Sequence, residues 1–331
     1  MVKARKIILI IILVLVGIVT TAGASVGTYY LIASKSTTER ASIAPKEHEF
    51  VYIDDEKYEA KETVNYLVVG IDSKGPMKAS NGYNNTALND FMCLISFNLI
   101  DKTYFALPIN RDTMVDVDVV GLSGKVIGSR HTQIAYAHTM GNGLNVSFEN
   151  TCRAVSKVLL NVDIERYVGI NMTTMIMIND FLGGVTITLD EDLSKLNKDW
   201  VEGATITLTG NDCEKYIRAR QGVSDGTQIS RMHRQKIYIE EVMRKARETD
   251  YKFSDILDLL HIINKYTCMN VTYMDMSDIL EYVKTFTFLS IMQIEGSAIV
   301  NNNLVEFTPD QEKLKEFITT YFYTKLEEDE E

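Results

Sequence analysis

Residues 7–33 contain no charged side chain and begin with an unbroken apolar run. Because about 20 apolar residues are enough for a helix to cross a bilayer, this segment is long enough to span a membrane. Three basic residues, Lys3, Arg5 and Lys6, precede it, and basic flanks favour the cytoplasmic side. The segment therefore predicts a short cytoplasmic tail (1–6), one transmembrane anchor (7–33) and a body outside the cytoplasm.

A cleaved signal peptide is the alternative interpretation of this segment. Ala22-Gly23-Ala24 has the small residues typical of a cleavage site, but the uncharged stretch continues well past it, which favours an uncleaved anchor. In both cases the body lies in a compartment that permits disulfides. The four cysteines allow three pairings, and their spacing favours none of them.

The composition of the body excludes several functional classes. The net charge is −11, and every acidic residue lies beyond the uncharged segment, so the body is a poor candidate for general nucleic-acid binding. No Cys-x-x-Cys motif occurs and the five histidines are scattered, which argues against a zinc ribbon or a thioredoxin-like centre. The chain has 331 residues, of which 46% are apolar, and it can therefore bury a sizeable core.

The apolar runs divide the remaining chain into a polar stalk and a globular body. Residues 34–62 are polar and charged, which is typical of a linker. Short apolar runs then predict buried strands, and amphipathic patterns predict helices. The predicted strands are 64–70, 91–97, 103–109, 166–170, 184–189 and 203–208, and the predicted helices are 148–160, 173–182 and two that Asn211 and Ser230 cap.

The alternation of strands and helices predicts an α/β fold with a mixed central sheet flanked by helices. Residues 63–247 form the main domain in this interpretation. Residues 248–331 extend the same globular body with helical patterns, a strand near 291–294 and an exposed acidic tail at 327–331.

Charged residues lie at the ends of three predicted strands. Asp72 follows the first strand, Asp90 precedes the second, and Arg111 and Asp112 follow the third. If these strands are neighbours in one sheet, their ends lie close together at the kind of edge where α/β proteins build sites. The carboxylates of Asp72 and Asp90 then suggest a divalent cation, Mg²⁺ or Mn²⁺, held together with phosphate oxygens. The alternative is that each aspartate only caps a turn.

A second group of charged residues is basic. Arg218 and Arg220 end one predicted helix, and Arg231, Arg234 and Gln235 share one face at the start of the next. Cations oppose the helix dipole at an N-terminus, so arginines at this place favour an anion-binding role, with phosphate as the natural counter-charge. The alternative is salt bridging to the acidic residues nearby in the sequence, at positions 212, 214, 225, 240 and 241.

Seven segments in a fixed order make the chain resemble the LytR–CpsA–Psr (LCP) phosphotransferases of bacterial cell envelopes. The resemblance covers residues 63–247, and the single N-terminal span with its short stalk also matches the family. The segments are Tyr66-Leu-Val-Val-Gly-Ile-Asp72, Asn89-Asp90, Arg111-Asp112-Thr113, residues 133–143, Asp180-Phe-Leu-Gly-Gly-Val185, Arg218-Ala-Arg220 and Arg231-Met-His-Arg-Gln235.

The resemblance implies an extracytoplasmic enzyme that transfers a phosphate-linked glycopolymer, such as a teichoic acid or a capsular or secondary wall polysaccharide. It implies a polyprenyl-pyrophosphate carrier as donor and peptidoglycan as acceptor. The implied location is the membrane of a Gram-positive-type bacterium, with membrane lipid as a partner and no nucleic acid.

The resemblance also implies roles for individual residues. Asp72 and Asp90 correspond to the Mg²⁺ and pyrophosphate carboxylates, with Asp90 as the expected proton acceptor, and Arg111 corresponds to the strand-end arginine that meets the pyrophosphate. The residues that correspond to the group stabilising the transferring phosphoryl are Arg218, Arg220, Arg231 and Gln235, and we expect Arg234 to contact substrate beside Gln235. Phosphoryl transfer depends on positioning and charge neutralisation, so the lack of a nucleophile triad is no objection.

Two departures from the family pattern leave an alternative open. Asn110 stands where the family has proline, and Leu88-Asn-Asp-Phe91 stands where it has Arg-x-Asp-Thr. The chain is then either a transferase with a different substrate or rate, or a degenerate protein that only binds lipid pyrophosphate. A membrane-tethered transcriptional regulator is disfavoured because the topology puts the body away from DNA.

Overall fold

The computed structural model describes residues 50–326 apart from 55, 81–84, 220–222, 224–227, 249–252 and 302–303. The predicted cytoplasmic tail, the transmembrane anchor, the stalk up to residue 49 and the acidic tail lie outside the described residues. Within the described part, no helix combines the length and the apolar character needed to cross a bilayer.

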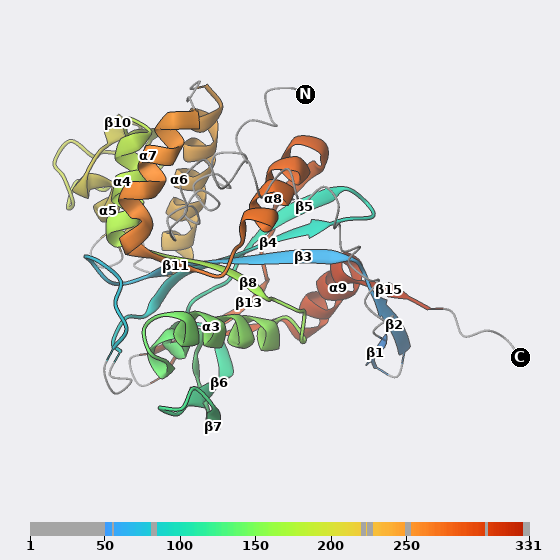
Figure 1. Cartoon of the computed structure of the whole chain (residues 1–331). Coiled ribbons are helices and arrows are strands. Elements are labelled where there is room, and N and C mark those ends of the chain that lie inside the picture. Colours follow the sequence, from blue (N-terminus) through green and yellow to red (C-terminus); the bar gives the residue numbers. More distant parts are fainter. Residues whose placement is uncertain are drawn as a thin grey trace, which may run out of the picture.

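A six-stranded mixed sheet forms the centre of the body (Figure 1). Its strands, in spatial order, are β11 (Thr267–Met269), β8 (Arg166–Asn171), β3 (Thr63–Ile71), β4 (Asn89–Asn98), β5 (Thr103–Pro108) and β12 (Thr287–Ile291). The β3–β8 and β5–β12 pairs are parallel, and the other pairs are antiparallel. The predicted mixed sheet is therefore confirmed.

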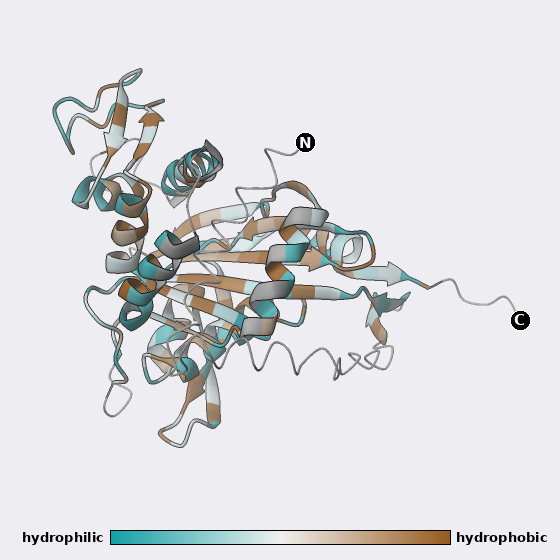
Figure 2. Cartoon of the chain, turned by 45° about the horizontal axis from the view of Figure 1, so that its top comes forward, coloured by the Kyte–Doolittle hydropathy of each residue, from teal (hydrophilic) through white to brown (hydrophobic). Residues whose placement is uncertain are grey.

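The central strands are buried on both faces, as their continuous apolar runs predict. In β3, Tyr66 and Val68 belong to one hydrophobic cluster, whereas Leu67 and Val69 belong to the cluster on the opposite face. The central strands are brown along much of their length in Figure 2. Fully burying one such side chain stabilises a fold by about 1.5–3 kcal/mol, so the sheet is a firm support for the residues at its edge.

Helices cover both faces of this sheet (Figure 1). The face of Tyr66 and Val68 packs against α4 (Met172–Phe181), α5 (Asn211–Arg218), α6 (Gln228–Glu248), α7 (Phe253–Ile263) and α8 (Tyr273–Thr285). The opposite face packs against α3 (Asn145–Val158), the short 3₁₀ helix η4 (Ile134–Met140) and α9 (Gln311–Phe322). On this face, the ring of Phe148 occupies the space that any side chain at Gly169 would need, so glycine lets α3 approach β8 closely.

Four smaller sheets surround the central one. The predicted neighbouring strands 184–189 and 203–208 are confirmed as the antiparallel pair β9 (Val185–Thr188) and β10 (Thr205–Leu208). Two further hairpins are β6 (Met114–Val120) with β7 (Val126–Gln133), and β13 (Gly296–Asn301) with β14 (Leu304–Pro309).

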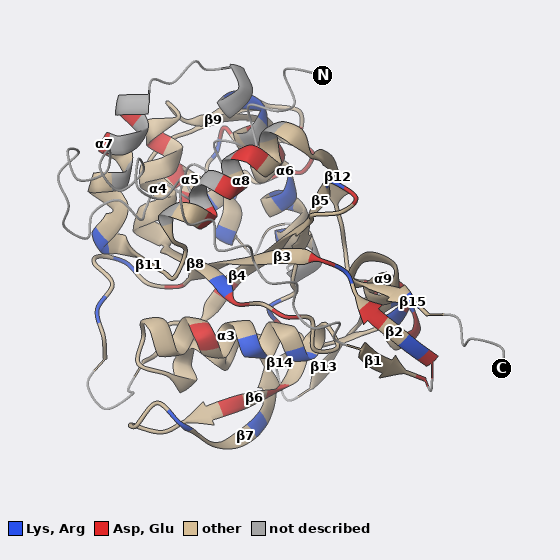
Figure 3. Ribbon diagram, turned by 45° about the vertical axis from the view of Figure 1, so that its right-hand side comes forward, with Lys and Arg blue, Asp and Glu red and all other residues tan. Residues whose placement is uncertain are grey.

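The fourth small sheet changes the interpretation of the predicted stalk. β1 (Phe50–Ile53) and β2 (Glu56–Ala60) form a hairpin, and β15 (Tyr323–Lys325) pairs with β2. Residues 50–60 therefore belong to the folded body, because they gain backbone hydrogen bonds from the C-terminal strand. Acidic and basic positions alternate in β2, whereas α3 has one acidic position followed by two basic ones (Figure 3).

Three predicted boundaries are wrong. The N-cap of α5 is Gly210 rather than Asn211, and the positive φ of 49° at Gly210 suits glycine. Ser230 lies inside α6, which begins at Gln228, because capping preference is weaker than tertiary context. The strand expected near 291–294 is β12, which lies earlier because Phe288 packs on Tyr104 at 5.2 Å between ring centroids.

Candidate active site

Three strand ends meet at one edge of the sheet, as predicted. β4 runs antiparallel to both β3 and β5, so its start lies beside their ends. Asp72 follows β3, Asp90 is the second residue of β4, and Arg111 follows β5. The register between β3 and β4 shifts at this place, because Gly70 pairs with Phe91 and Ile71 pairs with Asn89. Asp90 is thus the extra residue of a β-bulge, a feature that redirects a side chain.

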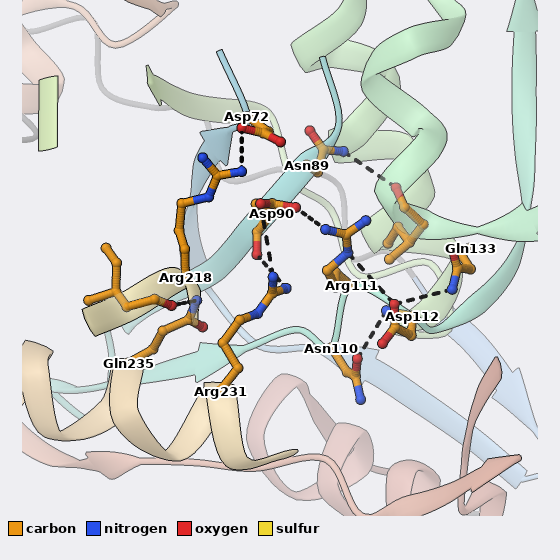
Figure 4. A network of polar contacts seen from close by, with 12 residues as sticks. Asp72, Asn89, Asp90, Asn110, Arg111, Asp112, Gln133, Arg218, Arg231 and Gln235 are labelled. Atoms are coloured by element: carbon orange, nitrogen blue, oxygen red, sulfur yellow. Dashed lines mark hydrogen bonds and ion pairs between the residues drawn. The ribbon is translucent and has the colours of Figure 1, made fainter. Parts of the chain in front are cut away.

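Asp90 is held between two guanidinium groups (Figure 4). One carboxylate oxygen of Asp90 pairs with Nη1 of Arg111, and the other lies 3.9 Å from Nη1 of Arg231. Nη2 of Arg231 lies 3.5 Å from the Asp90 carbonyl oxygen as a weak donor. All three side chains are at most 11% exposed. The structure thus brings together a buried carboxylate and two cations from the sheet edge and from α6.

Arg218 joins α5 to the same edge. Its Nη2 lies 2.8 Å from a carboxylate oxygen of Asp72, and its Nη1 donates to Glu214 over 2.9 Å. The side chains of Arg218 and Asp72 are 34% and 39% exposed, so this pair forms the solvent-facing side of the site. Arg218 therefore makes the salt bridge to Glu214 that the alternative interpretation expects and also pairs with Asp72 at the sheet edge, while its role in phosphate binding stays a prediction.

Arg218 and the carboxylates around it favour one another's charged forms. Burial lowers the pKa of Arg218, but its hydrogen bond to Glu214 and the negative charges of Asp72 and Asp90 outweigh burial and raise it. Burial raises the pKa of Glu214, but hydrogen bonds from Lys74 and Arg218 outweigh that effect and lower it. Glu214 therefore stays ionised and orients Arg218. From the sequence, Glu214 is expected only as a salt-bridge partner.

The predicted α6 residues divide between two neighbours. Arg231 points to Asp90, but the guanidinium of Arg234 is 1% exposed, lies 2.7 Å from a carboxylate oxygen of Glu191 and donates to the carbonyl of Ala219. The structure therefore places Arg234 in a buried contact with Glu191, away from Asp90, and its role as a substrate contact stays a prediction. Gln235 donates to the Ile217 carbonyl at 3.4 Å, at the end of α5. The remaining predicted arginine, at position 220, lies outside the described residues.

The side-chain oxygens at this edge are of the kind that a hard cation such as Mg²⁺ takes. The negative charges of Asp72 and Asp90 both raise the pKa of Arg218, so both carboxylates lie on the same side of the sheet edge as its guanidinium. Beside Asp90, the amide nitrogen of Asn89 donates to Thr151 over 3.1 Å, while its buried oxygen has no hydrogen-bond partner among the described residues. Those residues contain no group of three or more His, Cys, Asp or Glu side chains that could hold a metal ion. A hard cation at this edge would therefore need water and phosphate oxygens for most of its shell.

The fold is a mixed α/β sheet that gathers carboxylates and arginines at one edge. The chain belongs to the LytR_cpsA_psr family, whose model matches residues 26–322. The family resemblance in the sequence is therefore confirmed over nearly the whole chain.

Several curated relatives are similar in sequence to part or most of this chain. A protein of Bacillus cereus called polyisoprenyl-teichoic acid–peptidoglycan teichoic acid transferase TagU is 27% identical over 67% of this chain and 65% of its own length. A TagU of Bacillus licheniformis is 23% identical over 95% of this chain and 94% of its own length. The chain spans less than two thirds of the length of several curated relatives that it matches.

A solved structure supports the fold. The structure described as TagT bound to LIIa-WTA matches 84% of this chain and 96% of its own length, with a TM-score of 0.57 and 20% sequence identity. At this identity the comparison shows the shared fold, and the function must be argued from the site.

Proposed function

We propose that this chain is an extracytoplasmic phosphotransferase. It moves a phosphate-linked glycopolymer, a teichoic acid or another wall polysaccharide, from a polyprenyl-pyrophosphate carrier to peptidoglycan. The observation that supports it most is the meeting of Asp72, Asp90, Arg111, Arg218 and Arg231 at one sheet edge. The relatives named for teichoic acid transfer support the same reaction class.

The proposed reaction exchanges the phosphoanhydride bond of the donor for a phosphodiester bond to the acceptor. A peptidoglycan hydroxyl attacks the phosphorus next to the polymer, a new O–P bond forms, and the bridging P–O bond of the pyrophosphate breaks. Polyprenyl phosphate leaves, and the hydroxyl proton passes to a carboxylate, which we assign to Asp90. Negative charge grows on the leaving phosphate, so guanidinium groups fixed at this place stabilise the transition state more than the substrate.

Each arginine has a distinct proposed place in this reaction. Arg111 and Arg231 lie deep in the site against Asp90, and their forks are suited to the bridging and leaving oxygens of the pyrophosphate. Arg218 is more exposed and is suited to the phosphate that carries the polymer. Positioning and charge neutralisation account for most of the catalysis in phosphoryl transfer.

Asp72 and Asp90 would hold a divalent cation, Mg²⁺ or Mn²⁺, that neutralises charge on the pyrophosphate oxygens. The cation binding is supported by the charge balance of the site. Arg218 and Arg111 are each already paired with a carboxylate, so the site offers little excess positive charge to a pyrophosphate. A divalent ion on the same carboxylates would free these guanidinium groups for the substrate.

The two departures from the family pattern do not favour the alternative of a degenerate binding protein. Asn110, in the place of proline, accepts the backbone N–H of Asp112 at 3.0 Å and so stabilises the turn that contains Arg111. The backbone carbonyl of Leu88, in the place of arginine, accepts a hydrogen bond from the N–H of Asp72 at 2.9 Å. Binding an anion alone also has no need of two carboxylates in the same site.

The test is a transfer assay with a synthetic lipid-pyrophosphate glycopolymer and peptidoglycan fragments. We expect transfer by the wild-type protein, loss of transfer with EDTA, recovery with Mg²⁺ or Mn²⁺, and no transfer by Asp90→Ala, which should still fold. Full activity in EDTA would contradict the cation site but not the transfer. Tight binding of the donor without release of polyprenyl phosphate would support the degenerate alternative.

We further propose that the uncharged segment 7–33 anchors the protein in the cell membrane with the body outside. This position suits a donor whose polyprenyl chain lies in the membrane lipid. It also gives the body access to peptidoglycan and separates it from nucleic acid.

A further inference from the structure

The C-terminal hairpin, formed by β13 and β14, lies against the turn that contains Arg111. Residues 110–113 connect β5 to β6, and Thr113 forms an isolated bridge with Phe307 of β14. Nearly 200 residues of chain separate these two segments. The hairpin is therefore part of the surroundings of the site, although the charged residues of the site all precede it in the sequence.

Backbone hydrogen bonds fix the Arg111 turn from two sides. On one side, η4 donates from Ala135 to the Arg111 carbonyl at 3.1 Å and from Ile134 to the Thr113 carbonyl at 2.7 Å. On the other side, the N–H of Phe307 donates to the Asp112 carbonyl at 2.9 Å. The turn is thus held between a helix and the C-terminal hairpin.

One side chain extends this connection to the guanidinium of Arg111. Nε2 of Gln133 donates to a carboxylate oxygen of Asp112 at 3.2 Å and to the Val305 carbonyl at 2.6 Å. The same Asp112 oxygen lies 3.6 Å from Nε of Arg111, as Figure 4 shows. Gln133 and Asp112 are 6% and 2% exposed. A continuous chain of contacts therefore runs from β14 through Gln133 and Asp112 to Arg111 and on to Asp90.

These contacts use both donors of the Gln133 amide. A carboxylate and a carbonyl accept from the same nitrogen, and the NH₂ group of glutamine offers two donors without adding a charge. A residue without these donors would leave the Asp112 carboxylate and the Val305 carbonyl without this hydrogen bond, and buried polar groups without a hydrogen bond are destabilising.

The hairpin is shaped to keep this contact. Phe307 is 6% exposed, and its ring tip would lie 2.5 Å from any Cβ placed at Gly296. Glycine at this place lets β13 lie close to Phe307 and so holds β14 against the turn.

We propose that Gln133 and the C-terminal hairpin are positioning elements of the proposed phosphotransferase, and that they set the orientation of Arg111 through Asp112. The inference rests on the proposed function for its main measurement. Gln133 does not touch the substrate, so it should affect the rate of the chemical step more than binding of the donor.

The experiment compares Gln133→Met, which keeps the length but removes both donors, with Asn301→Ala as a matched control. Asn301 lies in the same hairpin, where it donates to Glu306 at 3.1 Å. We expect Gln133→Met to lower kcat by about 10-fold or more with little change in KM, since a displacement of about 1 Å in a site can cost 10²-fold. Asn301→Ala should match the wild-type protein in both constants.

A double-mutant cycle separates positioning from a general loss of structure. If Gln133 acts through Arg111, its substitution should matter little once Arg111→Lys is present, so the two losses should not multiply. Independent, multiplying losses would overturn the proposal, as would a normal kcat for Gln133→Met. Gln133→Glu supplies a second variant, whose rate relative to wild type should rise as pH falls from about 8 to about 5, because a buried carboxyl gains a donor on protonation.

A failure of the proposed function gives a different result from a failure of this inference. If the wild-type protein does not transfer the polymer, the positioning role is tested instead by comparing crystal structures of the wild-type protein and Gln133→Met. An Arg111 side chain displaced from Asp90 in Gln133→Met supports the positioning role, and an unchanged Arg111 overturns it.

Discussion

Substituting Arg218 by lysine tests whether the arginines act on substrate or only stabilise the fold. The guanidinium of Arg218 makes two contacts at once, to Asp72 at 2.8 Å and to Glu214 at 2.9 Å. Its side chain is 34% exposed, so one part remains open to a ligand. Lysine keeps the charge but replaces the planar fork by a single ammonium group.

The two roles predict different magnitudes. Exposed ion pairs contribute about 0.2–1 kcal/mol each, and lysine can retain one of the two pairs. The expected loss of stability is therefore below about 1 kcal/mol, which corresponds to a fall in Tm of about 2–4 °C for a body of this size. Loss of one preorganised donor to a developing charge lowers a rate by about 10²–10³-fold.

The assay measures polymer transfer and thermal unfolding on the same preparations. Arg153→Lys is the matched control, because Arg153 is 40% exposed, donates to Asp118 at 2.8 Å and lies in α3, away from the site. We expect Arg218→Lys to lose transfer while Arg153→Lys keeps it, with similar small changes in Tm. Near-normal transfer by Arg218→Lys together with a clear fall in Tm would refute the reasoning.

Three further predictions concern stability and location. Arg234→Met should destabilise the protein by about 3 kcal/mol, measured by urea unfolding, because it leaves the half-buried carboxylate of Glu191 without its partner. Adding Glu191→Gln should recover part of the loss. Burial lowers the pKa of His138 to about 4. Between pH 7 and pH 5 this histidine therefore gains a proton in the unfolded chain but not in the folded one, and the free energy of unfolding should fall by about 2 kcal/mol. The fall should be smaller in His138→Gln. Protease added to wall-stripped cells should digest the body, and a protected body would contradict the proposed topology.

The edge of the sheet could be predicted because strong local signals define it. Apolar runs that are too regular for loops predict β3, β4 and β5, and each run has a charged residue at its end. The short connection between β4 and β5 requires them to be antiparallel neighbours. Given that pairing, Asp90 and Arg111 must lie at the same edge, whatever the rest of the chain does.

Other parts of the site depend on contacts between distant segments, which local patterns do not encode. The spacing of Arg231, Arg234 and Gln235 places them on one face of a helix. Because successive residues are rotated by about 100°, such a face is broad enough to contact two neighbouring segments. Arg231 meets Asp90, whereas Arg234 meets Glu191 from the β9–β10 connection. The bulge at Asp90 and the docking of the C-terminal hairpin likewise follow from strand register and packing.

The central claim is that the site breaks a lipid pyrophosphate and joins the polymer to peptidoglycan through a phosphate. The most direct measurement is mass spectrometry of both products after incubation of the protein with the lipid-linked donor, peptidoglycan fragments and Mg²⁺. The account predicts polyprenyl phosphate and a peptidoglycan fragment linked to the polymer by one phosphodiester, in equal amounts. Intact donor bound to the protein, or polyprenyl phosphate without the linked fragment, would contradict it.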